Sequence, residues 1–168
     1  MKIKDIIQDA GKLLGLDAPK NSANWSILFR CANLAVSNVA SNYKDCITEQ
    51  TFNVTDTIIT FDQFNKPFLK VKSIKSGGTE VNYELYIDFL VVPNGKIKVQ
   101  YACVPKFVSN DDDISIIGGI MNEGILLYGI MAEYAYISGL VDEVKLYNDK
   151  FEQLLFGMHK SGKTRVMP

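Results

Sequence analysis

The segment Gly118-Gly-Ile-Met-Asn-Glu-Gly-Ile-Leu-Leu-Tyr-Gly-Ile-Met-Ala-Glu-Tyr-Ala-Tyr-Ile-Ser138 decides the fold of this chain. Its only charged residues are Glu123 and Glu133. Apolar side chains cover almost the whole circumference of the helix that it predicts, so this helix is expected to be buried in a protein core or in a membrane. Asn122 and the two glutamates disfavour a membrane span, because the segment is barely long enough to cross a bilayer.

The rest of the chain offers a limited core to surround such a helix. We therefore expect neighbouring subunits to bury part of it, and the glycines along the segment would permit a close approach, although each costs about 1 kcal/mol of helix stability relative to Ala. The subunit interface is assigned to four large side chains in the middle of the segment: Ile125, Tyr128, Met131 and Tyr134.

A further amphipathic helix is predicted over residues 140–156, and Gly157 occupies the position that a C-terminal capping glycine prefers. Residues 157–168 then form an extended, flexible tail with three basic residues and no acidic one. From Gly157 to Thr164 this tail matches the phosphate-binding pattern G-x-x-x-x-G-K-[ST]. A working loop of this kind joins a strand to the start of a helix, whereas here a helix precedes the pattern. We therefore expect neither nucleotide binding nor a cofactor.

The first half of the chain predicts two helices and then a run of strands. Apolar residues recur at helical spacing over residues 3–15, and Ser22 is the expected N-cap of a helix over residues 22–41. From about residue 46 to 107 the period becomes two, and β-branched and aromatic residues become frequent. Ser76-Gly-Gly-Thr79 predicts a turn, and Pro93-Asn-Gly95 predicts a tight hairpin.

Together these patterns predict an α+β fold that is mainly helical. It would be a bundle of about four helices with an inserted antiparallel β-meander and a flexible C-terminal tail. We expect a single domain over residues 1–156, with helices over 3–15, 22–41, 118–138 and 140–156, the meander over 46–107, and the tail over 157–168.

The acidic run Asp111-Asp-Asp113 has two interpretations, a metal site or helix capping. No further carboxylates recur at the spacing of a calcium loop, which favours capping. The three cysteines are widely spaced and the chain has one histidine, His159, so a zinc site is not expected. A net charge of −1 gives no global attraction to nucleic acid or to an anionic membrane.

The order of these patterns resembles that of head-to-tail adaptor (connector) proteins of tailed bacteriophages, of the tail tubular protein A or ring-protein type in short-tailed phages. The resemblance covers nearly the whole chain and has moderate specificity. The residues that carry it are Ile3-Lys-Asp-Ile-Ile-Gln-Asp-Ala10, Gly95-Lys-Ile-Lys-Val-Gln-Tyr101, Val104-Pro105, Asp111-Asp-Asp-Ile114, Glu123-Gly-Ile-Leu-Leu-Tyr-Gly129, Ala132-Glu-Tyr-Ala135, Gly139-Leu-Val-Asp-Glu143 and Tyr147-Asn-Asp-Lys-Phe151.

The resemblance implies a virion structural protein, made in the cytoplasm of the host bacterium and located at the head-tail junction. It would form a homo-oligomeric ring, usually of twelve subunits, beneath the portal protein. The strands would meet the downstream tail or ring protein, and DNA would pass through the central channel with non-specific contacts. The tail would bind the portal through six residues: Lys160, Lys163, Arg165, Val166, Met167 and Pro168.

Two alternatives to the adaptor remain open. The chain would be another phage neck or tail-completion protein, or a monomeric binding module that uses Tyr83, Tyr86, Phe89 and Tyr101 of the meander. An enzyme is not expected, since the single histidine lies in the predicted tail, where a general base cannot be held in position. No catalytic, cofactor-binding or metal-binding residue is therefore assigned, and no membrane partner is expected.

Overall fold

The computed structural model describes residues 2–107, 111–117, 119 and 121–161. The chain divides into two compact units, which are described separately here. The helical unit comprises Met1–Val39 and Lys106–Pro168, and the strand unit comprises Ala40–Pro105. The class is α+β, as the sequence predicted, but the predicted bundle of helices with an inserted β-meander is wrong, because the strands form two antiparallel sheets and the helices do not form a bundle.

Helices α1 (Ile3–Leu13) and α2 (Ala23–Asn42) begin the helical unit. In α1, Ile3, Ile6, Ile7 and Ala10 are buried, as their helical spacing predicted. Ser22 precedes α2, and its Oγ accepts a hydrogen bond from the backbone N–H of Trp25 at 3.1 Å, which confirms the predicted N-cap. One face of α2 is buried, formed by Trp25, Leu28, Ala32, Ala35, Val36 and Val39.

The all-round apolar helix α3 (Glu123–Ile137) begins later than the sequence predicted. The Oδ1 of Asn122 accepts a hydrogen bond from the backbone N–H of Ile125 at 2.9 Å and so caps the helix. Upstream, Ile114–Ile117 form a short 3₁₀ helix, η2, and Gly119 has a φ of +68°. A left-handed residue cannot continue an α-helix, so the predicted start at Gly118 is displaced to the residue after Asn122.

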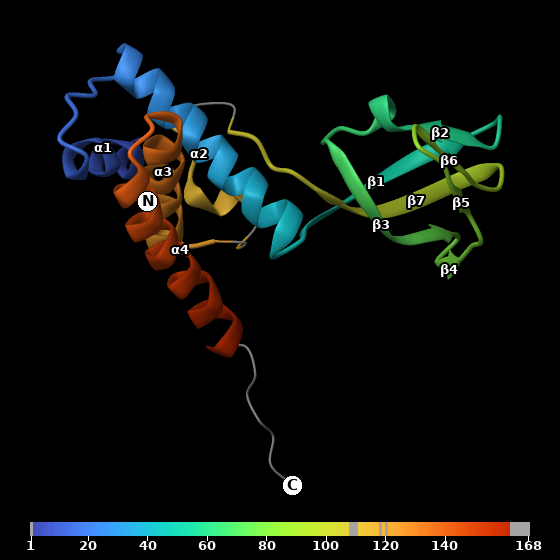
Figure 1. Ribbon diagram of the computed structural model, residues 1–168. Coiled ribbons are helices and arrows are strands. Elements are labelled where there is room, and N and C mark those ends of the chain that lie inside the picture. Colours follow the sequence, from blue (N-terminus) through green and yellow to red (C-terminus); the bar gives the residue numbers. More distant parts are fainter. Residues whose placement is uncertain (1, 108–110, 118, 120, 162–168) are drawn as a thin grey trace, which may run out of the picture. The chain divides into compact units, whose positions relative to one another are not determined.

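Helix α4 (Val141–Ser161) forms an antiparallel hairpin with α3 (Figure 1). It continues past Gly157, where the sequence predicted that it would end, so the first residues of the predicted tail belong to this helix. The side chains of residues 158–161 and all of residues 162–168 lie outside the described part of the chain.

Only α3 and α4 lie side by side as an antiparallel pair, and α1 and α2 run at an angle to them, whereas all the helices of a bundle lie nearly parallel or antiparallel (Figure 1). Because α3 is apolar on every side, its neighbours cover it from several directions: α1 and α4 pack on it, and Ala35 of α2 approaches Gly129. The direction of α1 is fixed at its start, where the N–H of Ile3 donates to the carbonyl of Asp112 at 3.0 Å.

The strand unit contains two antiparallel sheets. One has the order β1-β7-β3-β4, from strands Cys46–Val54, Gly95–Cys103, Phe68–Ser76 and Thr79–Glu80. The other has the order β2-β6-β5, from strands Ile58–Thr60, Phe89–Val91 and Glu84–Leu85. The 3₁₀ helix η1 (Phe61–Gln63) follows β2. A meander would pair consecutive strands, but β7 pairs with β1 and β3 instead.

The predicted hairpin at Pro93-Asn-Gly95 is therefore wrong. The chain passes there from β6 in the three-stranded sheet to β7 in the four-stranded sheet. The Oδ1 of Asn94 accepts a hydrogen bond from the N–H of Thr57 at 3.0 Å, so this residue links two loops instead of forming a two-residue turn. Long-range pairing prevails because β1 and β7 form a continuous register from Cys46↔Cys103 to Val54↔Gly95, whereas β6 has only three residues. The turn predicted at Ser76-Gly-Gly-Thr79 is confirmed, since Ser76 pairs with Thr79.

An aromatic cluster forms much of the core of the strand unit. Phe64 lies at its centre, with its ring centroid 4.9 Å from that of Phe52, 5.1 Å from that of Phe68 and 4.6 Å from that of Tyr101. On β7 the predicted alternation is confirmed: Ile97, Val99 and Tyr101 are buried, and Lys96, Lys98 and Gln100, which alternate with them, are exposed. This alternation gives the four-stranded sheet one apolar and one polar face.

Candidate functional site

The four residues predicted to form the subunit interface occupy different environments on α3. Ile125 and Met131 are 0% and 4% exposed in the isolated chain, so neither side chain is available on its surface. Tyr128 and Tyr134 are half-buried. The helix is covered on most sides by its own helical unit, which reduces the need for a neighbouring subunit at these positions.

The helices of this unit pack closely at Gly129. A Cβ at this position would lie 2.8 Å from the Cβ of Ala35 in α2 and 3.1 Å from Cε2 of Phe151 in α4. Carbon atoms this close repel each other strongly, so the absence of a side chain allows three helices to approach at one level. Gly129 thereby helps to set the position of the α3–α4 hairpin.

Apolar side chains are exposed where α3 meets α4. Tyr136, Ile137, Leu140 and Val141 surround the turn at Gly139, and we call these four residues the turn cluster. They are 74%, 51%, 39% and 78% exposed. Exposed apolar residues scattered singly are normal on a protein surface, whereas a contiguous group on one helix–helix turn is a candidate contact surface.

A depression of about 300 Å³ lies next to the turn cluster, lined by Ala132, Glu133, Tyr136, Val144 and Asn148. Burial raises the pKa of Glu133, because removal from water disfavours the charged carboxylate. Burial also raises the pKa of the Cys31 thiol to about 11, and the negative charge of Glu133 contributes in the same direction. The site is thus an apolar surface with one carboxylate at its margin, and it carries no nucleophile activated by a lowered pKa.

The acidic run Asp111-Asp-Asp113 anchors the start of α1. The Nζ of Lys4 lies 2.9 Å from Oδ1 of Asp111, and this interaction holds the pKa of Asp111 below its ordinary value. The N–H of Ser115 donates to Oδ1 of Asp113 at 3.1 Å, so Asp113 caps η2 and its pKa is lowered as well. Of the two interpretations, the geometry supports capping. Within the described residues, no group of three or more His, Cys, Asp or Glu side chains could hold a metal ion.

The predicted portal-binding residues fall at the end of the described chain. Lys160 belongs to α4, but its side chain is among those not described, and Lys163, Arg165, Val166, Met167 and Pro168 lie outside the described residues. The structure places Gly157–Ser161 of the phosphate-binding pattern in a helix instead of a loop after a strand. The tail hypothesis therefore still rests on the sequence.

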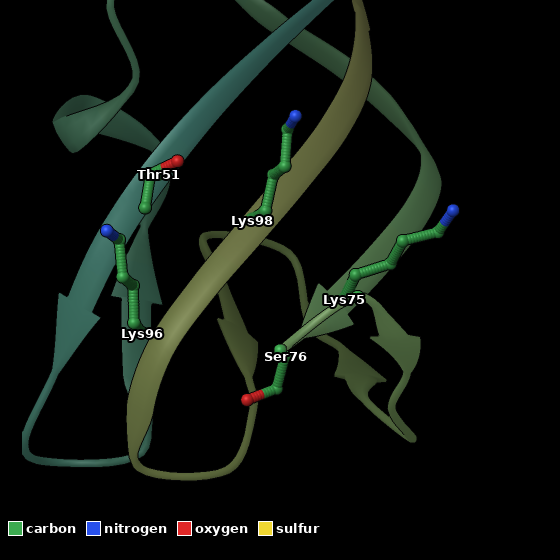
Figure 2. A pocket seen from close by; sticks show the side chains of 7 residues that line it. Thr51, Lys75, Ser76, Lys96 and Lys98 are labelled. Carbon is green, nitrogen blue, oxygen red and sulfur yellow. The ribbon is translucent and has the colours of Figure 1, made fainter.

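A second candidate surface was not assigned from the sequence. It is a depression of about 500 Å³ on the polar face of the four-stranded sheet. Figure 2 shows Lys96 and Lys98 on β7, with Thr51 of β1 on one side and Lys75 and Ser76 of β3 on the other. The alternation of lysines with buried residues on β7 was a signal that could have identified this face. Their position beside Lys75 depends on the pairing of β3 with β7, which the meander prediction did not contain.

No family model matches the chain, and no curated protein matches it. None of the helices in the described part of the chain is long and apolar enough to span a membrane.

Proposed function

We propose that this chain is a structural protein of a tailed bacteriophage that forms a ring between the portal vertex of the capsid and the tail. The ring surrounds the channel through which DNA leaves the capsid. In this proposal, the protein is assembled in the bacterial cytoplasm, functions in the virion and has no enzymatic activity. Its partners are other copies of the same chain, the portal protein and a downstream tail or ring protein.

The observation that carries the proposal is the turn cluster. Val141 and Tyr136 are 78% and 74% exposed, and complete removal of one such side chain from water contributes about 1.5–3 kcal/mol. Repetition of one contact around a closed ring requires that this surface meets a different surface of the next subunit. Leu13 of α1 and Ile27 and Leu34 of α2 are exposed apolar residues on the same unit and are candidates for that second surface.

The order of elements along the chain also supports the proposal. Two helices, a strand region, an acidic segment and a helical hairpin follow one another as in the connector proteins that the sequence resembles. The portal contact is assigned to the C-terminal residues Lys160, Lys163, Arg165 and 166–168, whose positive charge suits an acidic surface of a partner.

A binding module that acts through the strand unit is the second candidate, and one observation favours it. Tyr83, Leu85, Tyr86 and Ile87 are all exposed, and Ile87 is 92% exposed. Of the aromatic residues proposed for such a site, Tyr101 is 1% exposed and belongs to the core. Tyr86 is 48% exposed and stacks on the half-buried Phe89 with a centroid distance of 4.7 Å. These two rings are therefore the ones that such a site could use.

A paired set of variants tests the ring. Tyr136→Gln with Val141→Gln removes the most exposed apolar side chains of the turn cluster without opening the core. Ile47→Thr with Ile58→Thr is the matched control, since these two residues of the strand unit are 53% and 46% exposed. We expect the first pair, and not the second, to abolish ring formation or attachment to a portal ring in sedimentation velocity. Equal assembly of both variants would refute the role of the turn cluster.

A further inference from the structure

Charge is distributed unequally between the two sheets of the strand unit. The strands of the four-stranded sheet carry five lysines and two glutamates: Lys70, Lys72, Lys75, Lys96, Lys98, Glu49 and Glu80. The strands of the three-stranded sheet carry one charged residue, Glu84, and the segments next to them carry Asp56, Asp62, Lys66 and Asp88. The positive charge therefore gathers on one sheet, although the whole chain has a net charge of −1.

Acidic neighbours neutralise only part of this positive charge. Lys70 and Lys72 both pair with Asp45, and the Nζ of Lys98 lies 2.7 Å from Oε1 of Glu49. Within the described residues, Lys75 and Lys96 form no ion pair. The free positive charge lies at the end of the sheet formed by the β3–β4 turn and the start of β7.

The depression of about 500 Å³ lies at this end. Its lining consists of Lys75, Lys96, Lys98, the hydroxyl-bearing Thr51 and Ser76, and the turn glycines Gly77 and Gly78. Lys96 and Lys98 are two residues apart on one strand, so their Cα atoms are about 7 Å apart and their side chains leave the same face. In Figure 2 Lys96 and Lys98 leave β7, Thr51 lies on the neighbouring β1, and Lys75 extends from β3 on the other side.

The composition of this lining indicates the chemistry of its ligand. It contains no carboxylate, no aromatic ring and no large aliphatic side chain. A protein partner would normally place apolar and aromatic groups at the centre of a contact, and nothing in this lining would receive them. Ammonium and hydroxyl donors suit phosphate oxygens, and lysine binds phosphate as a point charge. Lys75 and Lys96 form no ion pair among the described residues, and at Lys98 a phosphate would compete with Glu49.

We propose that this face of the four-stranded sheet binds the phosphodiester backbone of a nucleic acid through Lys75, Lys96 and Lys98. No aromatic side chain in the lining could stack on a base, so binding is independent of sequence. Three lysines make a weak site in a single chain, and repetition in an oligomer would raise the affinity through effective concentration. The site depends only on the strand unit and stands whether or not the chain forms a connector ring.

The test measures the salt dependence of DNA binding by the full chain, with a fluorescein-labelled duplex of mixed sequence and fluorescence anisotropy between about 50 and 200 mM salt. Each phosphate contact contributes about −0.9 to the slope of log K against log salt, so three contacts per subunit predict a slope of about −2.7. Lys75→Gln with Lys96→Gln should lower the affinity at the lowest salt by at least tenfold and reduce the slope to about −0.9 per subunit.

The matched control is Lys145→Gln with Lys150→Gln, which removes the same charge from exposed positions on α4. It should leave both the affinity and the slope unchanged, and a second duplex of unrelated sequence should bind the wild-type chain equally well.

Equal losses in the two double variants would overturn the proposed site, as would the absence of binding at the lowest salt. Saturable binding of inorganic phosphate at Lys96 without binding of the duplex would also overturn it, since the ligand would then be a small phosphate. A monomeric chain that binds DNA through these lysines would refute the ring and leave this site standing.

Discussion

Among the described glycines, Gly129 is the one at which a single added methyl group should disturb the packing most. An added Cβ would lie 2.8 Å from the Cβ of Ala35 and 3.1 Å from Cε2 of Phe151. The Ala35 Cβ is attached directly to a helix backbone, and Phe151 is only 3% exposed, so neither neighbour can move alone. Overpacking of this kind costs about 2–3 kcal/mol, at the upper part of the usual range. Replacement of Gly by Ala within a helix returns about 1 kcal/mol.

Gly129→Ala is therefore expected to lower the free energy of unfolding by about 1–2 kcal/mol. Urea unfolding followed by the fluorescence of Trp25 measures this change, because Trp25 is the only tryptophan and is buried in α2 of the same unit. With an m value of about 2 kcal/mol/M, the midpoint should fall by roughly 0.5–1 M.

Gly124→Ala is the matched control in the same helix. Its Cβ would meet Cδ1 of Leu154 at 3.5 Å and Oδ1 of Asn122 at 3.6 Å, which are ordinary contacts, so this variant should be as stable as the wild type or more stable. Ala35→Gly combined with Gly129→Ala should recover part of the loss, as a double-mutant cycle would show. If Gly129→Ala is as stable as Gly124→Ala, the packing of α3 against α2 and α4 described above is incorrect.

Three further predictions concern other parts of the chain. Burial raises the pKa of Glu133 in the folded chain. The stability contributed by its protonated form is therefore full below about pH 4 and is lost as the pH rises through the folded pKa. Glu133→Gln should raise the urea midpoint at pH 7 but not at pH 4. Asp111 has a lowered pKa, so the stability it contributes is present at neutral pH and lost as the pH falls through that pKa; Asp111→Asn should show a smaller loss of stability in acid, and an unchanged acid profile would contradict its pairing with Lys4. Burial raises the pKa of the Cys103 thiol to about 11, and Cys31 and Cys46 are buried as well. A chromogenic thiol reagent at pH 8 should therefore react slowly with all three cysteines until urea is added. Rapid reaction without urea would show that these thiols are accessible.

Local patterns in the sequence predicted local structure well. The helical spacing of Ile3, Ile6 and Ile7 identified the buried face of α1, and Ser22 marked the start of α2. The alternation on β7 identified its buried side, and the two glycines after Ser76 located a turn. Each of these features is determined by residues a few positions apart, so a periodic pattern carries the information.

The features that the sequence missed depend on long-range pairing. Asn94-Gly95 has the composition of a hairpin, but β7 has a nine-residue partner in β1, and that longer pairing determines the topology. Likewise, the apolar character of Ile125 and Met131 indicated burial but not whether the same chain or another subunit would cover them. The lysine face emerged only when the pairing of β3 with β7 placed Lys75 opposite Lys98.

The most direct test of the ring is a measurement of mass by multi-angle light scattering, with negative-stain imaging, on the protein alone and after mixing with a candidate portal ring. The proposal predicts closed rings of the chain, or copies of it attached to the portal ring. A monomer of 18.8 kDa that remains separate from the portal at all concentrations would contradict it.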